Sequence, residues 1–168
     1  MNDRQIQQSL EELRFTAGLS DDDQRKLSAI ASTHSFPKGT VLYTEGDVNK
    51  EVHVIRSGRV EVCMSVPARG CLPVLTLEPG DCIGWSAILE LGGMTATVVA
   101  LEDVETVSLD ADRLRALCDE DHDIGYHIME RIAHALSQRL TASRLQMLDI
   151  YGQEVFDNQR NETPGGAL

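Results

Sequence analysis

The spacing of apolar and polar positions changes twice along this chain. Near the start, residues 5–15 place apolar side chains at helical intervals, which predicts a short amphipathic helix. A second helix is expected to begin at Ser20, a good N-cap followed by acidic residues that the helix dipole favours, and to end near Ser32. Beyond residue 33 the apolar segments shorten, and beyond residue 109 the helical spacing returns.

Short apolar segments alternate with Gly, Pro and Asp between residues 33 and 109, which is typical of strands joined by tight turns. Residues 56–59, with Gly58 supplying a positive φ, predict a hairpin between two of these strands. Residues 77–109 indicate a strand, a tight turn, a short helix at 85–90, a glycine-rich bend and two more strands. The whole pattern predicts a β sandwich or barrel. The earlier strands are expected at residues 34–36, 41–43, 52–55, 60–64 and 72–77.

The last third of the chain predicts helices. Asp110 can cap a helix that ends near Cys118, and the longest helical pattern runs from about Ile124 to Tyr151. At 1.5 Å per residue this second helix would be about 40 Å long, more than one small barrel covers. We therefore expect its apolar stripe to pair with a second copy; the alternative is that it packs back on its own barrel. The stripe comprises Ile124, Ile128, Ile132, Leu136 and Leu140.

These patterns divide the chain into four parts. An N-terminal helix occupies residues 1–18, a barrel 19–122, and a long helix 123–153. Residues 154–168 are polar and rich in Gly and Pro, so we expect a disordered tail there.

The acidic composition argues against nucleic-acid binding. The chain has 27 acidic and 15 basic residues, a formal net charge of −12. Nucleic acids are bound through lysine and arginine, which displace counterions from phosphate, so we expect no nucleic-acid partner. No apolar run approaches the ~20 residues of a membrane span, and the start lacks the apolar block of a secretory signal. We therefore expect a cytoplasmic protein with no membrane partner.

Catalytic and metal-binding patterns are missing from the sequence. His127 and His134 lie seven residues apart, unlike the i, i+4 pair of a zinc-binding helix, and no serine lies in a nucleophile elbow. We expect no enzyme activity, no metal and no cofactor. The four cysteines lack paired spacing, so we expect them to be reduced and mostly buried, with a redox sensor as the alternative.

Four fragments, in order, resemble the cyclic nucleotide-binding domain family. They are FPKGTVLYTEGD (36–47), VIRSGRVEV (54–62), LEPGDCIG (77–84) and TATVVA (95–100). The resemblance implies a mainly β fold with flanking helices: a double-stranded β-helix, or jelly roll, of about eight strands. N-terminal helices and a long C-terminal dimerisation helix would flank it, as in catabolite-activator-type sensor barrels. A helix-turn-helix does not fit after residue 151, so we expect a stand-alone bacterial member without a DNA-binding domain.

The phosphate-binding cassette of that family is degenerate here. Ligand-binding members carry a glutamate for the ribose hydroxyl where this chain has Trp85, and an arginine for the cyclic phosphate where it has Met94. Methionine cannot replace the forked, charge-assisted pair between arginine and phosphate. The candidate ligand pocket comprises Gly84, Trp85, Ser86, Ala87, Ile88, Met94, Thr95 and Ala96.

Three interpretations of the pocket stay open. Trp85 and Met94 can fill it as core, or it can accept an altered small ligand. That ligand would be an apolar molecule or an anion held by Ser86, Thr95 and the N-terminus of the short helix. The third is true cyclic AMP or cyclic GMP binding. We expect a cytoplasmic regulatory sensor that binds a non-standard effector or signals through a protein partner as a homodimer. The alternative is a dimeric adaptor that binds no ligand.

Overall fold

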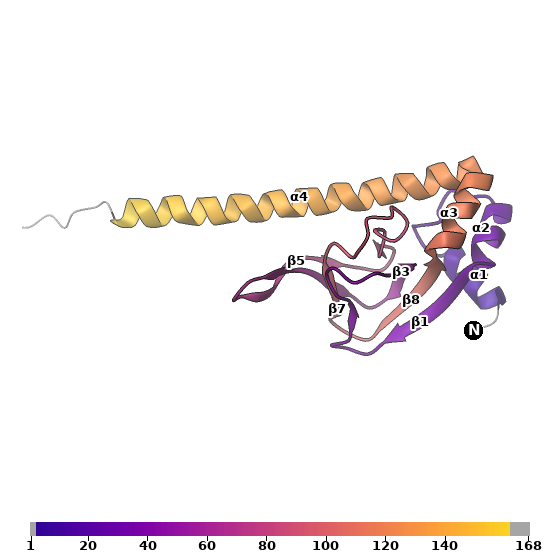
Figure 1. Cartoon of the computed structure of the whole chain (residues 1–168), viewed down its shortest axis with the longest axis horizontal. Helices are drawn as coiled ribbons and strands as arrows, with labels where there is room; N and C mark the ends of the chain where they lie inside the picture. The colour runs from indigo at the N-terminus through magenta and orange to yellow at the C-terminus, as the bar shows by residue number, and fades with distance from the viewer. Residues whose placement is uncertain (1–2, 162–168) are drawn as a thin grey trace, which may run out of the picture.

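The computed structural model describes residues 3–161 and contains eight strands in two four-stranded antiparallel sheets. The strand orders are β1-β8-β3-β6 and β2-β7-β4-β5, with helices gathered at one end of the sheets (Figure 1). This confirms the predicted jelly roll of about eight strands. The strands are β1 (Ala31–Phe36), β2 (Val41–Tyr43), β3 (Glu51–Ser57), β4 (Val60–Val66), β5 (Gly70–Leu77), β6 (Cys82–Ile83), β7 (Thr97–Ala100) and β8 (Val104–Asp110).

The predicted hairpin between β3 and β4 is wrong. The chain does reverse at Gly58, where φ is +82° and an added Cβ would lie 2.3 Å from the carbonyl oxygen of Asp103. However, β3 pairs with β6 and β8, whereas β4 pairs with β5 and β7. The glycine therefore carries the chain from one sheet to the other, because a turn signal specifies a reversal but not the hydrogen-bond partner of each strand.

The two N-terminal helices are shorter than predicted. Helix α1 spans Asp3–Glu11, and turns follow it instead of helix up to residue 15. Helix α2 spans Asp21–Ser28, with Ser20 as the expected N-cap in a capping box. It ends before Ser32 because residues 31–36 pair along β8 as strand β1.

Two further helices follow the last strand. Helix α3 (Ala111–Glu120) begins at the expected cap, where the Asp110 carboxylate accepts a 2.8 Å hydrogen bond from the backbone N–H of Arg113. Helix α4 (His122–Asn161) has 40 residues, about 60 Å at 1.5 Å per residue, and runs well past the strands (Figure 1). Residues 154–161 are thus helical, which corrects the expected tail. Residues 162–168 lie outside the described part.

The apolar stripe of α4 divides into two parts. Ile124, Ile128 and Ile132 are at most 2% exposed and pack into a core with α1, α2, α3 and one sheet. These three side chains cannot contact a second copy, so the dimer prediction is wrong for them. They follow the alternative prediction, in which the stripe packs on its own domain. Leu136 and Leu140 remain 37% and 53% exposed, because they border an open groove between α4 and strands β4 and β5.

One cysteine pair corrects the expectation of four reduced thiols. Cys63 and Cys71 form a disulfide across the β4–β5 hairpin, with 5.4 Å between their Cα atoms. In the register of the hairpin Cys63 lies opposite Pro73 and Cys71 opposite Ser65, so the disulfide joins diagonal neighbours on the two strands. Cys82 and Cys118 are free.

Candidate functional site

The cassette between β6 and β7 is a series of turns and not the expected short helix. The N–H groups of Ala87 and Ile88 donate to the carbonyls of Gly84 and Trp85 at 3.0 and 3.2 Å. A regular helix does not continue because φ turns positive at Glu90 (+53°). The segment therefore has no regular helix N-terminus that could attract an anion.

Neighbouring elements hold the cassette in place. Gly84 permits close approach to β3, since an added Cβ would lie 2.5 Å from the carbonyl oxygen of Glu51. Met94 exchanges two backbone hydrogen bonds, each 2.8 Å, with Gly46 and Asp47 in the loop after β2. From α3, the Arg115 guanidinium donates a 2.8 Å bond to the carbonyl of Ala87. The loop is tied to three separate parts of the domain.

The side chains at the two altered positions are buried. Trp85 and Met94 are each 6% exposed. Trp85 packs in the core shared with the helices, and Met94 packs between the two sheets. The buried Ser86 hydroxyl lies 3.5 Å from the Met94 sulfur, as donor. Together they fill the place where the family arrangement puts a ribose and a phosphate.

The space left inside the cassette is about 10 Å³, roughly what a single water molecule requires. Six of the eight predicted pocket residues surround it, namely Gly84, Trp85, Ser86, Met94, Thr95 and Ala96. Ala87 and Ile88 do not: Ile88 is core, and Ala87 lines a separate surface hollow with Glu90 and Arg115. The predicted residues are thus mostly brought together around this small space, and three of them, Trp85, Thr95 and Ala96, also line a larger groove beside α4.

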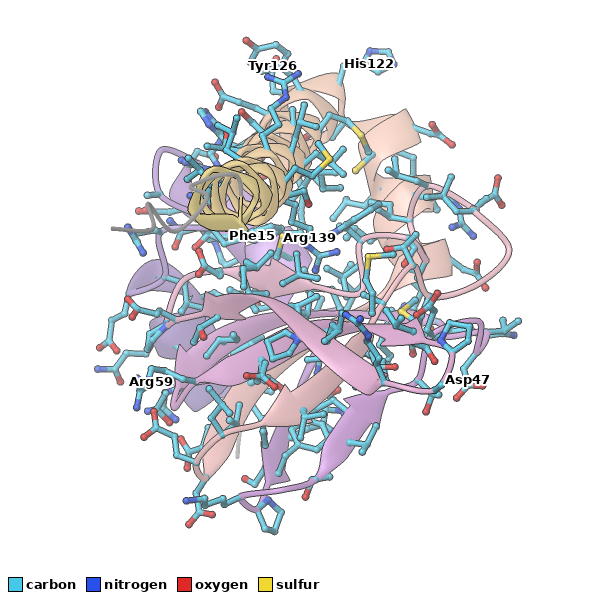
Figure 2. All side chains as sticks on the ribbon, turned by 90° about the vertical axis from the view of Figure 1, so that its left-hand side faces the viewer. Phe15, Asp47, Arg59, His122, Tyr126 and Arg139 are labelled. Atoms are coloured by element: carbon cyan, nitrogen blue, oxygen red, sulfur yellow. A yellow bond between two sulfur atoms is a disulfide. The ribbon has the colours of Figure 1, made fainter. Side chains whose placement is uncertain are left out.

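Sequence reasoning missed Arg139 of α4. Its guanidinium carbon lies 5.0 Å from the centre of the Trp85 ring, a cation–π contact. Figure 2 shows the side chain beneath α4, between the helix and the strands. Burial lowers the pKa of Arg139 from its ordinary value, and Cys82 acts in the opposite direction. The sequence offered one signal for Arg139: this charged residue directly precedes Leu140, which belongs to the predicted apolar stripe.

Arg139 also borders an open groove between α4 and the second sheet. The groove has a volume of about 270 Å³. Its walls are mostly apolar, and Arg139 is the one charged residue among them; Thr95 and Ser143 supply hydroxyls. The remaining lining residues are Val62, Met64, Val74, Leu75, Trp85, Ala96, Leu136 and Leu140.

Within residues 3–161 no group of three His, Cys, Asp or Glu side chains is placed to hold a metal ion. No helix in that range combines the length and apolar character of a membrane span.

Comparisons with known proteins identify the family. The cyclic nucleotide-binding domain family matches residues 18–121. The CRP-like cAMP-activated global transcriptional regulator of Mycobacterium tuberculosis is 25% identical over 120 residues, 71% of this chain and 52% of the relative. The cyclic AMP receptor protein of Thermus thermophilus is 28% identical over 115 residues, 68% of this chain and 49% of the relative. The chain thus spans about half the length of these relatives.

Solved structures share the fold. A cyclic nucleotide-binding domain from Methylobacillus flagellatus superposes with a TM-score of 0.66 at 22% identity, covering 99% of this chain and 86% of that one. The regulatory subunit of a cAMP-independent protein kinase A from Trypanosoma brucei, as a triple mutant bound to cAMP, gives 0.69 at 21% identity, covering 86% and 52%. On the family match and the fold, the chain belongs to the cyclic nucleotide-binding domain family of regulatory sensor proteins.

Proposed function

We propose that this chain is a regulatory domain whose cassette is closed to cyclic nucleotides and whose output passes through α4. The observation that carries the proposal is the burial of Trp85 and Met94 around a space of about 10 Å³. The chain would act as a sensor or interaction module, with no catalytic role. Its cassette is then a packing element that connects the sheets to the helix.

The energetic argument compares this cassette with one that binds cyclic AMP. Seating a nucleotide would expose the Trp85 indole, at a cost of roughly 2–3 kcal/mol for a buried aromatic side chain. Because no arginine is present at position 94, the charge-assisted hydrogen bonds to the cyclic phosphate are also lost, which weakens binding by roughly 1.5–3 kcal/mol more. The sum of about 4 kcal/mol or more corresponds to about a thousandfold weaker binding.

The proposed output element is α4. Its first half packs on the domain, and Arg139 touches the cassette through Trp85. Its second half passes beyond the strands (Figure 1) and carries exposed Leu145, Met147 and Leu148. Exposed apolar side chains on a projecting helix favour pairing, so we propose that two copies associate along this half. A change at the cassette would shift the dimer only if it favoured one placement of α4.

Calorimetric titration with cyclic AMP and cyclic GMP tests the closed cassette. The wild-type chain should show no binding at millimolar ligand. The double variant Trp85→Glu/Met94→Arg should gain binding, because both partners of the nucleotide return. The apolar double variant Trp85→Phe/Met94→Leu is the matched control and should not bind.

Two outcomes would reject the proposal. Micromolar binding of cyclic AMP by the wild-type chain is one, and it needs no variant that might misfold. The other is that Trp85→Glu/Met94→Arg unfolds cooperatively, and so is folded, but binds neither cyclic nucleotide. Trp85 and Met94 would then not be the reason why the cassette excludes nucleotides. The trypanosomal regulatory subunit is a precedent for the design, because it was solved with cAMP as a triple mutant.

A further inference from the structure

We propose that the groove between α4 and the β4–β5 hairpin binds a small monocarboxylate with an apolar body, with Arg139 as its anion receptor. The inference rests on the proposed function, because a cassette closed to cyclic nucleotides leaves the groove, which shares Trp85, Thr95 and Ala96 with it, as the site for an effector. In this proposal the residue that binds the anion is Arg139 on α4, because the cassette has Met94 at the position of the family's arginine.

The geometry of Arg139 favours a ligand in the groove. The guanidinium carbon lies over the Trp85 ring, 5.0 Å from its centroid. A cation–π contact uses none of the five N–H donors of the guanidinium, so they remain available to a ligand. Within residues 3–161 no carboxylate forms an ion pair with this guanidinium. A half-buried cation without a counter-charge is costly, and a bound anion removes that cost.

The walls of the groove indicate what the rest of the ligand is. The strand side is apolar, with Val62, Leu75 and the 47% exposed Met64. The helix side contributes Leu136 and Leu140, whose exposure leaves apolar surface to be covered. On the scale used for the cassette, a volume of about 270 Å³ has room for on the order of twenty water-sized groups.

The charge balance selects a monoanion. Arg139 is the one charged residue that lines the groove, and its fork matches the two oxygens of a carboxylate. The hydroxyls of Thr95 and Ser143 in the same lining supply further hydrogen-bond partners. A phosphate dianion would leave one charge uncompensated beside apolar walls. The net charge of −12 also disfavours anions that lack this short-range pairing.

Octanoate and octan-1-ol form a matched pair of probes, equal in apolar body and different in charge. Trp85 is the only tryptophan in the chain, and it lines the groove, so its fluorescence reports occupancy directly. The full chain should bind octanoate roughly 10- to 100-fold more tightly than octanol, because a charged hydrogen bond contributes that much. Arg139→Gln should remove this preference and leave octanol binding unchanged. Arg144→Gln, an exposed arginine on the same helix outside the groove, is the control and should behave as the wild type.

Equal binding of the two probes, or an unchanged octanoate affinity in Arg139→Gln, would overturn the inference. If neither probe binds and Arg139→Gln alters the sedimentation coefficient, a second copy occupies the groove, and the inference also fails. Cyclic AMP added as a competitor separates the two proposals. Displacement of octanoate by cyclic AMP would reject the closed cassette, whereas absence of both binding events would reject only the monocarboxylate site.

Discussion

The burial of His53 makes the stability of the domain depend on pH. This residue lies on the central strand β3 and is 3% exposed. Its Nδ1 atom is 2.8 Å from the Thr106 hydroxyl, and Glu51 approaches the other ring nitrogen at 3.5 Å. The rings of His34 and Tyr43 pack against it at 5.2 and 5.6 Å. Burial, and secondarily the charge of His34, lower the pKa of His53 to about 4.

The sign and size of the effect follow from linkage. An unfolded histidine has a pKa near 6.5, so between about pH 6.5 and pH 4 the unfolded chain binds a proton that the folded chain excludes. Stability is therefore fully present above about pH 6.5 and falls as the pH drops towards the folded pKa of about 4. One pKa unit is about 1.4 kcal/mol, so His53 alone costs roughly 2 kcal/mol between pH 8 and pH 5.

Urea unfolding across this pH range, in wild type and His53→Gln, measures the contribution. Glutamine keeps a hydrogen bond to Thr106 but does not titrate. Carboxylates also titrate below about pH 6, so the quantity to compare is the difference between the two curves. The wild type should lose roughly 2 kcal/mol more than the variant. His122→Gln, at an exposed position on α4 (Figure 2), is the control. Parallel curves for wild type and His53→Gln would refute the assignment.

Two further predictions test the helix and the hairpin. Ile128→Ala should lower the free energy of unfolding by about 2–5 kcal/mol, because Ile128 is fully buried, while Leu140→Ala should change it by less than about 1 kcal/mol. An equal loss at Leu140, measured by denaturant unfolding, would mean that a second chain covers that position. Loss of the Cys63–Cys71 crosslink, which closes a short loop, should cost roughly 2–3 kcal/mol in the Cys63→Ser/Cys71→Ser variant. Alkylation of the denatured chain without reductant, followed by mass spectrometry, should modify only Cys82, which is buried in the folded chain, and Cys118; modification of all four cysteines would reject the disulfide.

The parts of the fold that local chemistry determines could be predicted from the sequence. Gly58 and Gly84 both adopt positive φ at reversals of the chain, which their neighbours in sequence already indicated. The caps at Ser20 and Asp110 belong to the same class, since each bonds a backbone N–H three residues ahead. Spacing between such signals was enough for the family resemblance and the strand number.

The parts that depend on distant partners could not be predicted in this way. Periodicity places Ile124 and Leu140 on one stripe of α4, but only the packing of the folded chain decides that the first lies in the core and the second borders an open groove. The pairing of Cys63 with Cys71 required the register of β4 on β5. The partner of each strand depends on which sheet it enters, and residues near Gly58 do not encode that choice.

Trp85 and Arg139 together explain why the loss of the anion clamp leaves a connected domain. In a cassette that binds a nucleotide, the ligand joins the loop to its surroundings. Here the indole performs that role, since it packs into the core that also holds Ile124, Ile128 and Ile132 of α4. Arg139 contacts the same ring about two turns beyond the last of these. Any change that moves the indole must therefore disturb α4 at two places, its buried start and its exposed middle. Under the proposed function, an effector in the groove would act by strengthening a contact between the cassette and the helix that exists without it.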